Sequence, residues 1–263
     1  MQTQAVIEHI VRWLHDYAGQ ARVKGFIVGI SGGIDSAVVS ALAARTGLDV
    51  LLLEMPIRQQ AEQIDRAQQH IADLQSRFAN VRSLRVDLTP SFNLFAETVD
   101  VNESEYPAKQ LALANSRARL RMLTLYYYGQ INGLLVTGTG NKIEDFGVGF
   151  FTKYGDGGVD ISPIADLTKT QVYRLAESLD IIEAIRKAVP TDGLWDTERT
   201  DEQQMGASYP ELEWAMDIPA DKQPEDFEGR QREVLAIYRR LNRAAQHKIQ
   251  PIPVCNVPKE WLA

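Results

Sequence analysis

Glycine, serine and aspartate gather in one short segment, SGGIDS at Ser31–Ser36, between an apolar run and a helical pattern. Small side chains leave the backbone N–H groups of such a turn free to surround phosphate oxygens, and the start of the following helix adds partial positive charge. A tight turn followed by helix-capping residues is the structural alternative. This alternative explains the glycine pair and Asp35–Ser36 separately. It does not explain why the complete SGGIDS segment directly follows a predicted buried strand. The segment therefore predicts a nucleotide phosphate site.

The elements that position this turn are expected to alternate between strands and helices. Apolar runs predict strands at Phe26–Ile30, Val50–Met55, Leu84–Asp87 and Gly133–Gly138. Helical spacing of apolar residues predicts helices at Asp35–Arg45, Gln59–Leu74, Tyr106–Tyr128, Thr168–Leu179 and Glu225–Ala245. This alternation indicates an α/β fold with a doubly wound, mostly parallel sheet and helices on both faces, whose ligands bind at the carboxyl ends of the strands. We expect residues 1–263 to form a single domain.

One segment, Val189–Tyr209, is long, polar and without clear periodicity. Such a segment within a compact domain is either a disordered surface loop or a mobile lid over a site. Trp195 favours a lid, because disordered loops seldom carry tryptophan.

Composition narrows the class of protein. The 263 residues are 44% hydrophobic and carry a net charge of −7. An acidic balance argues against nucleic acid or an anionic membrane as the main partner, since both attract basic surfaces. The single cysteine, Cys255, cannot form an internal disulfide or a cysteine-based zinc site. No targeting pattern or membrane-length apolar run is visible, so a cytoplasmic protein is expected.

The phosphate turn resembles the SGGxDS loop of the ATP pyrophosphatases, which split ATP into AMP and pyrophosphate while adenylating an oxygen. The turn alone leaves several branches of that superfamily open. The segment GFFTKYGDGGVD at Gly149–Asp160 resembles the signature of the NAD synthetases. GTGNKIED at Gly138–Asp145, SPIADLTKTQV at Ser162–Val172 and VPTDGLW at Val189–Trp195 resemble further segments of that family. The likeness runs from about Phe26 to Lys248.

This resemblance implies an adenine nucleotide α-hydrolase-like fold and a ligase that forms a C–N bond. The substrates would be nicotinic acid adenine dinucleotide (deamido-NAD), ATP and ammonia, with Mg²⁺, and the products NAD, AMP and pyrophosphate. Some NAD synthetases carry a glutamine-hydrolysing domain with its own catalytic cysteine. Here a short helix precedes the phosphate turn and Cys255 lies near the other end, so free ammonia is the expected nitrogen donor.

The resemblance also assigns roles to individual residues. The residues implied to hold ATP are Gly29, Ile30, Ser31, Gly32, Gly33, Ile34, Asp35, Ser36, Thr139, Lys169 and Thr191. Asp35 and Glu144 would hold Mg²⁺. The residues implied to bind the dinucleotide are Arg119, Lys153, Asp160, His247 and Lys248. Asp156, in the GDGG turn, would handle ammonia, and Lys169 would also be catalytic.

Taken singly, these residues have simpler interpretations. Arg119 lies between two other arginines on a predicted helix, a pattern typical of a solvated face. Glu144 could be a surface acid, and His247 could complement a helix dipole. Gly155–Gly158 could make a tight turn. Cys255 is interpreted as structural or inert.

Two alternative functions remain open at this stage. The chain could be another adenylating amidotransferase or a tRNA-thiolating enzyme, although its acidic charge disfavours tRNA. It could also be a non-catalytic ATP-binding protein, although the joint presence of Asp35, Glu144, Lys153 and Lys169 argues against that. The family resemblance further implies a homodimer. The helix Tyr106–Tyr128 agrees with it, because the helix is apolar on more than one side.

Overall fold

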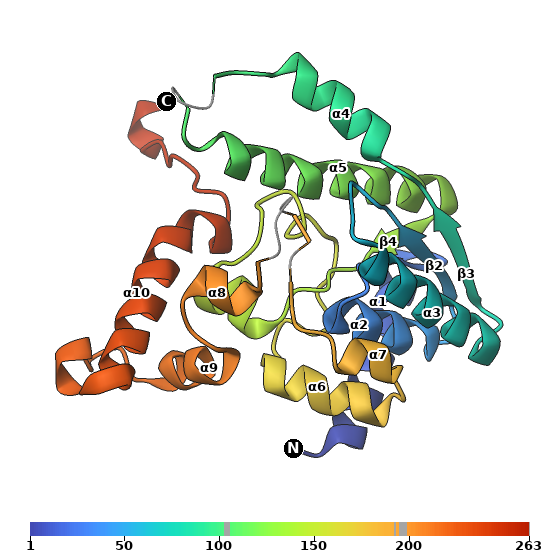
Figure 1. Ribbon diagram of the computed structural model, residues 1–263, viewed down its shortest axis with the longest axis horizontal. Helices are drawn as coiled ribbons and strands as arrows, with labels where there is room; N and C mark the ends of the chain where they lie inside the picture. The colour runs from blue at the N-terminus through green and yellow to red at the C-terminus, as the bar shows by residue number, and fades with distance from the viewer. Residues whose placement is uncertain (103–105, 192, 195–198, 263) are drawn as a thin grey trace.

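The computed structural model describes residues 1–102, 106–191, 193–194 and 199–262, and contains a sheet of four parallel strands, on the right in Figure 1. The order across the sheet is β3-β2-β1-β4. The strands are β1 (Gly25–Gly29), β2 (Asp49–Glu54), β3 (Val81–Arg85) and β4 (Leu134–Val136). The expected parallel α/β fold is therefore confirmed, with β3 starting three residues before the run that predicted it.

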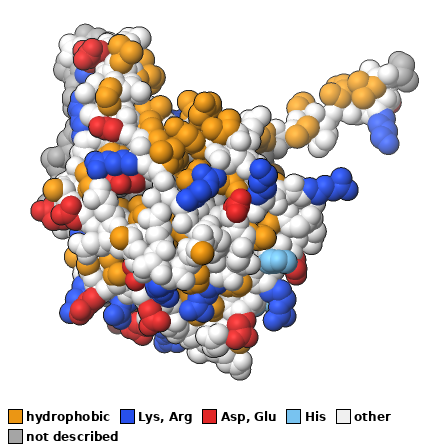
Figure 2. All heavy atoms as spheres, turned by 90° about the vertical axis from the view of Figure 1, so that its right-hand side faces the viewer, with side chains coloured by type: hydrophobic (Ala, Val, Ile, Leu, Met, Phe, Trp, Pro, Cys, Tyr) orange, Lys and Arg blue, Asp and Glu red, His pale blue; other side chains and the backbone are white. Residues whose placement is uncertain are grey.

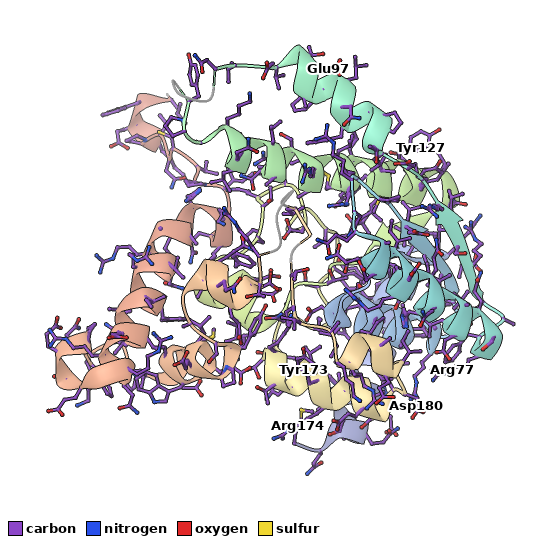
Figure 3. The ribbon with its side chains drawn as sticks, viewed as in Figure 1. Arg77, Glu97, Tyr127, Tyr173, Arg174 and Asp180 are labelled. Atoms are coloured by element: carbon purple, nitrogen blue, oxygen red, sulfur yellow. The ribbon has the colours of Figure 1, made fainter. Side chains whose placement is uncertain are left out.

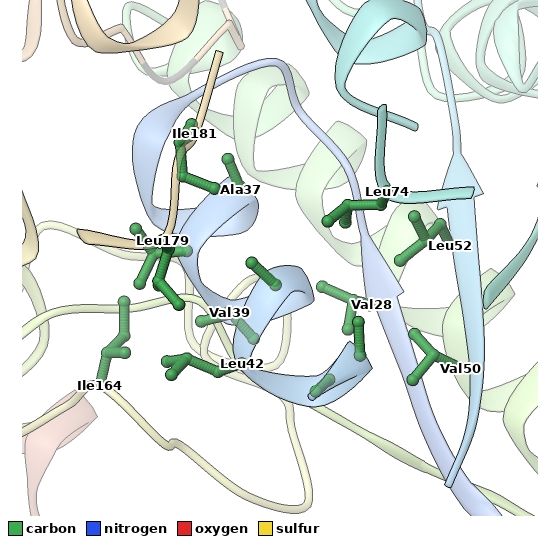
Figure 4. Packing of buried hydrophobic residues seen from close by; sticks show 14 of the residues in the cluster. Val28, Ala37, Val39, Leu42, Val50, Leu52, Leu74, Ile164, Leu179 and Ile181 are labelled. Atoms are coloured by element: carbon green, nitrogen blue, oxygen red, sulfur yellow. The ribbon is translucent and has the colours of Figure 1, made fainter. Parts of the chain in front are cut away.

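One face of the sheet is covered by the largest apolar cluster (Figure 4). Val28 of β1 and Val50 and Leu52 of β2 meet helix residues such as Val39 and Leu42 there. In α2 ten of eleven residues are buried, because this helix lies between the sheet and other helices. The helices that contribute to this cluster are α1 (Thr3–Ala21), α2 (Ile34–Ala44), α3 (Ala61–Arg77), α6 (Lys169–Ser178) and α7 (Glu183–Arg186).

The opposite face of the sheet packs against α4 (Thr89–Thr98) and α5 (Lys109–Asn132). Phe92 of α4 is buried there, and Leu113 and Leu120 of α5 pack against the same cluster. Other side chains of α5 point outward, and Leu123 and Tyr127 are 62% and 60% exposed. The helix thus offers one apolar side to its own sheet, while Leu123 and Tyr127 lie on its exposed side.

A third apolar cluster holds the second half of the chain together, to the left of the sheet in Figure 1. It is built from the π-helical turn η1 (Ile143–Val148), α8 (Asp201–Met205), α9 (Tyr209–Asp217) and α10 (Gly229–Ile249). Two short turns, η2 (Pro224–Asp226) and η3 (Lys259–Trp261), complete the list of elements in the described residues. No helix among the described residues is long and apolar enough to cross a membrane.

Helix α8 lies inside the segment expected to have no regular structure. Its start is a capping box, in which the Thr200 hydroxyl accepts from the Gln203 backbone N–H and the Gln203 side chain accepts from the Thr200 backbone N–H. The spacing T-x-x-Q is the sequence signal for this helix, and it was missed because the turn is too short for apolar periodicity. Trp195, which favoured a lid, lies outside the described residues.

The topology decides where a ligand can bind. From β1 the chain moves outward through β2 to β3, and β4 then pairs with the other side of β1. The connections on the two sides of β1 lead away from each other, which opens a crevice beyond the carboxyl ends of β1 and β4. The SGGIDS turn follows β1, and Thr137–Gly140 follows β4, so both predicted ATP segments lie at this crevice.

Candidate active site

The phosphate turn is shaped by its own serines. The Ser36 hydroxyl donates to the Gly33 carbonyl at 3.0 Å and lies 3.1 Å from the Ser31 hydroxyl, which in turn accepts from the Gly33 N–H at 3.1 Å. Gly32 has φ of +80°, and a Cβ there would lie 2.5 Å from the Gln63 carbonyl oxygen of α3. Only glycine fits this position, because both the backbone conformation and the neighbouring helix exclude a side chain.

A cavity of about 250 Å³ lies at the crevice. Thirteen of the predicted site residues line it: Gly29, Ile30, Ser31, Gly32, Gly33, Ile34, Asp35, Ser36, Thr139, Glu144, Asp156, Lys169 and Thr191. Every residue that the resemblance assigned to ATP, magnesium or ammonia is therefore at the cavity wall. Thr191 is tied to α3, since its hydroxyl accepts from the Gln63 side-chain amide at 2.9 Å.

Lys169 joins the two predicted magnesium carboxylates. Its ammonium donates to Asp35 Oδ2 at 2.5 Å and to Glu144 Oε1 at 2.9 Å, and its side chain is 3% exposed. The three residues come from the starts of α2, η1 and α6, so the site draws together segments far apart in the sequence. Thr168 caps α6 with a complete capping box, which fixes the first turn from which Lys169 points inward.

The charges of Lys169 and Glu144 stabilise each other, whereas burial and the charge of Glu144 hold the pKa of Asp35 above its ordinary value. Burial lowers the pKa of Lys169, but the charges of Asp35 and Glu144 outweigh it and hold that pKa above its ordinary value. Burial raises the pKa of Glu144, yet Lys169 and the hydrogen bond from Tyr209 bring it below its ordinary value. Lys169 therefore stays charged in this buried position because both carboxylates remain beside it.

Two residues that the sequence analysis did not assign organise the same group. The Asn141 amide donates to Asp35 at 3.2 Å, while its carbonyl oxygen accepts from the backbone N–H groups of Ile143 and Glu144 at 3.1 Å each. The Tyr209 hydroxyl donates to Glu144 Oε1 at 2.5 Å. Asn141 belongs to the GTGNKIED segment, so its place in a family motif indicated a role at the site. Tyr209 is 65 residues from Glu144, and no sequence pattern indicated that the two residues meet.

Two more carboxyl groups line the cavity, and both hold protons more tightly than usual. Burial in the cavity wall raises the pKa of Asp156 from 3.8 to about 6, against the lowering effect of backbone hydrogen bonds. Its carboxylate accepts from the Thr152 N–H at 2.9 Å, which fixes it within the GDGG turn. Burial and the nearby carboxylates of Glu144, Asp156 and Asp35 raise the pKa of Asp145 to about 8. The family resemblance assigns no role to Asp145, although it belongs to the GTGNKIED segment.

The carboxylates of Asp35 and Glu144 can supply part of a magnesium coordination shell but not all of it. Mg²⁺ prefers oxygen ligands and is commonly held by one or two carboxylates together with substrate phosphates and water. Among the described residues no group of three or more histidine, cysteine, aspartate or glutamate side chains could hold a metal ion. Asp35 and Glu144, which share the ammonium of Lys169, therefore suit a magnesium ion that is bound mainly by the phosphates of ATP.

The residues predicted to bind the dinucleotide are not among those that line the cavity. Arg119, Lys153, His247 and Lys248 form a separate cluster, which joins α5, the loop after η1 and the end of α10. Lys248 donates to the carbonyls of Gly149 and Phe151, the latter at 2.7 Å, and Lys153 donates to the His247 carbonyl at 2.5 Å. Arg119 donates to the Lys153 carbonyl at 3.3 Å. We call these four residues the carbonyl-bound cluster.

Asp160 belongs to neither group. One of its carboxylate oxygens accepts from the Val136 backbone N–H at 2.8 Å, and the other accepts from the Tyr126 hydroxyl at 3.0 Å. Both oxygens thus attach the end of the signature segment to β4 and α5. Burial and this hydrogen bond raise the pKa of Tyr126 to about 12.

Comparison with known proteins identifies the family of the chain. A model of the NAD synthase family matches residues 6–251. An NH(3)-dependent NAD(+) synthetase of Mycoplasma genitalium is 40% identical over 79% of this chain and 80% of that protein. One of Methanosarcina mazei is 35% identical over 97% and 98%. The solved structure of an NMN synthetase from Francisella tularensis is 30% identical, covers 98% of this chain and 100% of that one, and superposes with a TM-score of 0.85. The chain therefore belongs to the NAD synthase family.

Proposed function

We propose that the chain joins ammonia to the carboxyl group of nicotinic acid adenine dinucleotide, with ATP as co-substrate. A carboxylate oxygen of the acid attacks the α-phosphorus of ATP, and pyrophosphate leaves as the bond to the β-phosphate breaks. Ammonia then forms a bond to the activated acyl carbon, loses a proton, and AMP leaves. Activation is necessary because a carboxylate cannot expel oxide, whereas AMP is a good leaving group.

The turn Ser31–Ser36 holds the phosphates with its backbone N–H groups at the start of α2. Lys169 supplies a fixed positive charge where negative charge develops on the departing pyrophosphate. Asp35 and Glu144 would hold a magnesium ion, which would supply charge neutralisation of the phosphates. Asp156 receives ammonia, and its ionised form above about pH 6 can take the proton that the nitrogen releases.

The observation that carries this proposal is the contact of Lys169 with both Asp35 and Glu144 at the mouth of the phosphate turn. A turn that merely bound ATP as a signal would not require a buried cation held by two acids. Such a group suits a reaction in which pyrophosphate separates from AMP.

The test is to incubate the protein with ATP, the acid dinucleotide and ¹⁵N-ammonium and to measure pyrophosphate, AMP and NAD together. We expect equal amounts of the three products and ¹⁵N in the amide. ATP binding without turnover would indicate the non-catalytic alternative, and pyrophosphate release independent of the dinucleotide would indicate another adenylating enzyme. Glutamine in ammonia-free buffer should give no NAD.

A second candidate substrate is the acid mononucleotide, whose amidation gives NMN. Two observations favour it: the structural likeness to an NMN synthetase at a TM-score of 0.85, and the position of the carbonyl-bound cluster outside the cavity. The values of kcat/KM for the two acids decide between them. A ratio above about 10² in either direction corresponds to roughly 3 kcal/mol of discrimination and identifies the substrate.

The proposal includes a cytoplasmic homodimer with the dinucleotide bound near its twofold axis. The exposed side chains of Leu123 and Tyr127 support it, since they give α5 a second apolar side. It also includes a lid formed by residues 189–209, which would close over ATP and exclude water from the acyl-adenylate. Protection of this segment from proteases by ATP and the acid dinucleotide together is the result expected for a lid.

A further inference from the structure

The end of the chain forms an arm that is apolar yet exposed. Residues 251–262 follow α10, and all of them except Pro258 are exposed. Ile252, Val254, Trp261 and Leu262 are between 67% and 76% exposed. Among the described residues, the backbone hydrogen bonds of the arm are internal, from Trp261 to Pro258 and from Leu262 to Lys259. Exposed large apolar side chains of this kind mark a surface for interaction with another protein or ligand.

The arm is also stiff. It contains three prolines in twelve residues, and the two residues that flank its irregular part, Gln250 and Pro258, have polyproline-like backbone angles. An extended segment of this kind loses little conformational freedom on binding and typically docks on surfaces rich in aromatic side chains. The arm can reach about 40 Å at roughly 3.3 Å per residue.

A surface of matching chemistry lies on the outer side of α4 and α5. Its exposed apolar residues are Leu94, Phe95 and Val99 of α4 with its cap, and Leu123, Tyr127 and Ile131 of α5. The last three recur at every fourth position and therefore form one stripe along the helix. We call this set the α4–α5 surface. Figure 3 shows Tyr127 and Glu97 on these two helices, on the side of the molecule away from the phosphate turn.

The arm of a chain does not lie on its own α4–α5 surface. Figure 2 shows hydrophobic side chains gathered at the top of the molecule and a thin arm that projects away from the body. Two apolar surfaces of one chain that do not meet within that chain can meet between two copies, and twofold symmetry lets both pairs form at once.

We propose that the arm of residues 251–262 docks on the α4–α5 surface of a second copy of the chain, and that the exchange is reciprocal. This inference rests on the homodimer of the proposed function and adds the segment that joins it. The arm begins directly after the helix that carries His247 and Lys248. Docking therefore fixes the end of α10 and, through the contacts of Lys248 with Gly149 and Phe151, the signature loop.

The single thiol of the chain is a probe of the arm, because Cys255 is exposed and lies in its middle. The first experiment measures its rate of reaction with a disulfide reagent while sedimentation reports the mass. In the dimer we expect Cys255 to react at least tenfold more slowly than in a monomeric Tyr127→Asp variant. Equal rates in the two states would overturn the proposal, and so would slow reaction in a monomer, which would mean that the arm docks on its own chain.

The second experiment compares variants. A chain that ends at Gln250 and the Tyr127→Asp variant should each weaken dimerisation at least tenfold. Trp13→Asp, which changes an exposed aromatic residue on α1, is the matched control and should leave the dimer unchanged. Circular dichroism establishes that each variant is folded. A truncated chain that dimerises as tightly as the full chain would overturn the role of the arm.

The outcomes separate this proposal from the proposed function. If the full chain makes NAD from ammonia but sediments as a monomer at all concentrations, both the dimer and the arm contact are wrong and the catalytic proposal stands. If it dimerises with a freely reactive Cys255, the arm contact alone is wrong. If it makes no NAD while the arm is protected, the catalytic proposal alone is wrong.

Discussion

Two lysines lie in regions of the molecule that are built differently. Lys169 is almost fully buried and lies between two carboxylates, whereas Lys248 is partly buried and donates to the backbone carbonyls of Gly149 and Phe151. Burial lowers the pKa of Lys248, while the carboxylates hold the pKa of Lys169 above its ordinary value. The first region already presents its charges to the cavity. In the second, the side chains of Arg119, Lys153 and Lys248 donate to backbone carbonyls.

This difference indicates how the two halves of the site are completed. The groups around Lys169 need a ligand only to take up the phosphates, since the side chains that face the cavity are in place. If the carbonyl-bound cluster binds a phosphate, as the resemblance implies, its cations must first exchange their backbone contacts for that ligand. The four predictions that follow test this contrast, from the largest expected effect to the smallest.

Replacing Lys169 should have the largest effect. In Lys169→Met the carboxylates of Asp35 and Glu144 face each other without a cation, so we expect turnover to fall about 10²–10³-fold or more. Loss of one partner from a buried charged group should also lower the free energy of unfolding by about 3–5 kcal/mol without ligand. Pyrophosphate release and denaturant unfolding measure the two effects. Lys142→Met, at an exposed lysine paired with Asp166, is the control and should change neither.

Asp156 links the two regions, because its pKa responds to both Glu144 and Lys248. Asp156→Asn should reduce turnover about 10²-fold, since the amide cannot accept a proton from the nitrogen nucleophile. Its effect on stability should have the opposite sign. The folded pKa of about 6 lies above the ordinary value of 3.8, so the native state holds this proton more tightly and loses stability as pH rises through that window.

The wild-type protein should therefore show a fall in stability between about pH 4 and pH 6 that Asp156→Asn lacks. Thermal unfolding of both proteins at matched pH values measures the difference. The same slope in both would show that Asp156 does not titrate in this window. Activity should in addition rise toward the pKa of ammonium in both proteins, because NH₃ is the nucleophile.

Lys248→Met tests the carbonyl-bound cluster. Loss of a charged hydrogen bond of about 1.5–3 kcal/mol corresponds to a rise of roughly tenfold or more in the KM for the acid substrate. The KM for ATP should stay within about twofold, because Lys248 does not line the cavity. The matched control is Lys187→Met, since Lys187 is an exposed lysine directly after α7. Parallel changes in both KM values would show that the two regions are not separate.

The sequence predicted the cavity more completely than the surrounding helices, for a physical reason. A phosphate turn needs small residues at fixed spacing, and Gly32 has to be glycine because α3 lies against it, so the pattern is local and visible. The capping box of α8 is equally local but brief. The edge strand β3 exposes four of its five residues, so its apolar signal is weak and its predicted position was shifted.

The contacts that the sequence could not predict are those between distant segments. Tyr209 meets Glu144 only because α9 packs on η1, and no spacing in the sequence encodes that. The same holds for Arg119 and Lys248. Their charges were visible, but their engagement with carbonyl groups depends on how α5 and α10 approach the signature loop. The roles assigned to them by resemblance stay predictions.

Asp160 gives the smallest and most discriminating effect. It was predicted to bind the dinucleotide, yet each of its oxygens already accepts a hydrogen bond within the chain, from Val136 and from Tyr126. In Asp160→Asn one acceptor becomes an amide donor. The Tyr126 hydroxyl can rotate to accept from that amide, so the Val136 N–H keeps its partner. We therefore expect the free energy of unfolding to fall by about 1 kcal/mol.

If the contacts of Asp160 are structural, the KM for the acid substrate should change less than about twofold in this variant, since no charge is removed from a binding surface. Asp166→Asn, an exposed acid paired with Lys142, is the matched control and should have no effect on stability or KM. A rise in KM with unchanged stability would instead mean that the substrate displaces the contacts to Val136 and Tyr126. In that case Asp160 would resemble the carbonyl-bound cluster, whose polar groups are held by the chain until the ligand arrives.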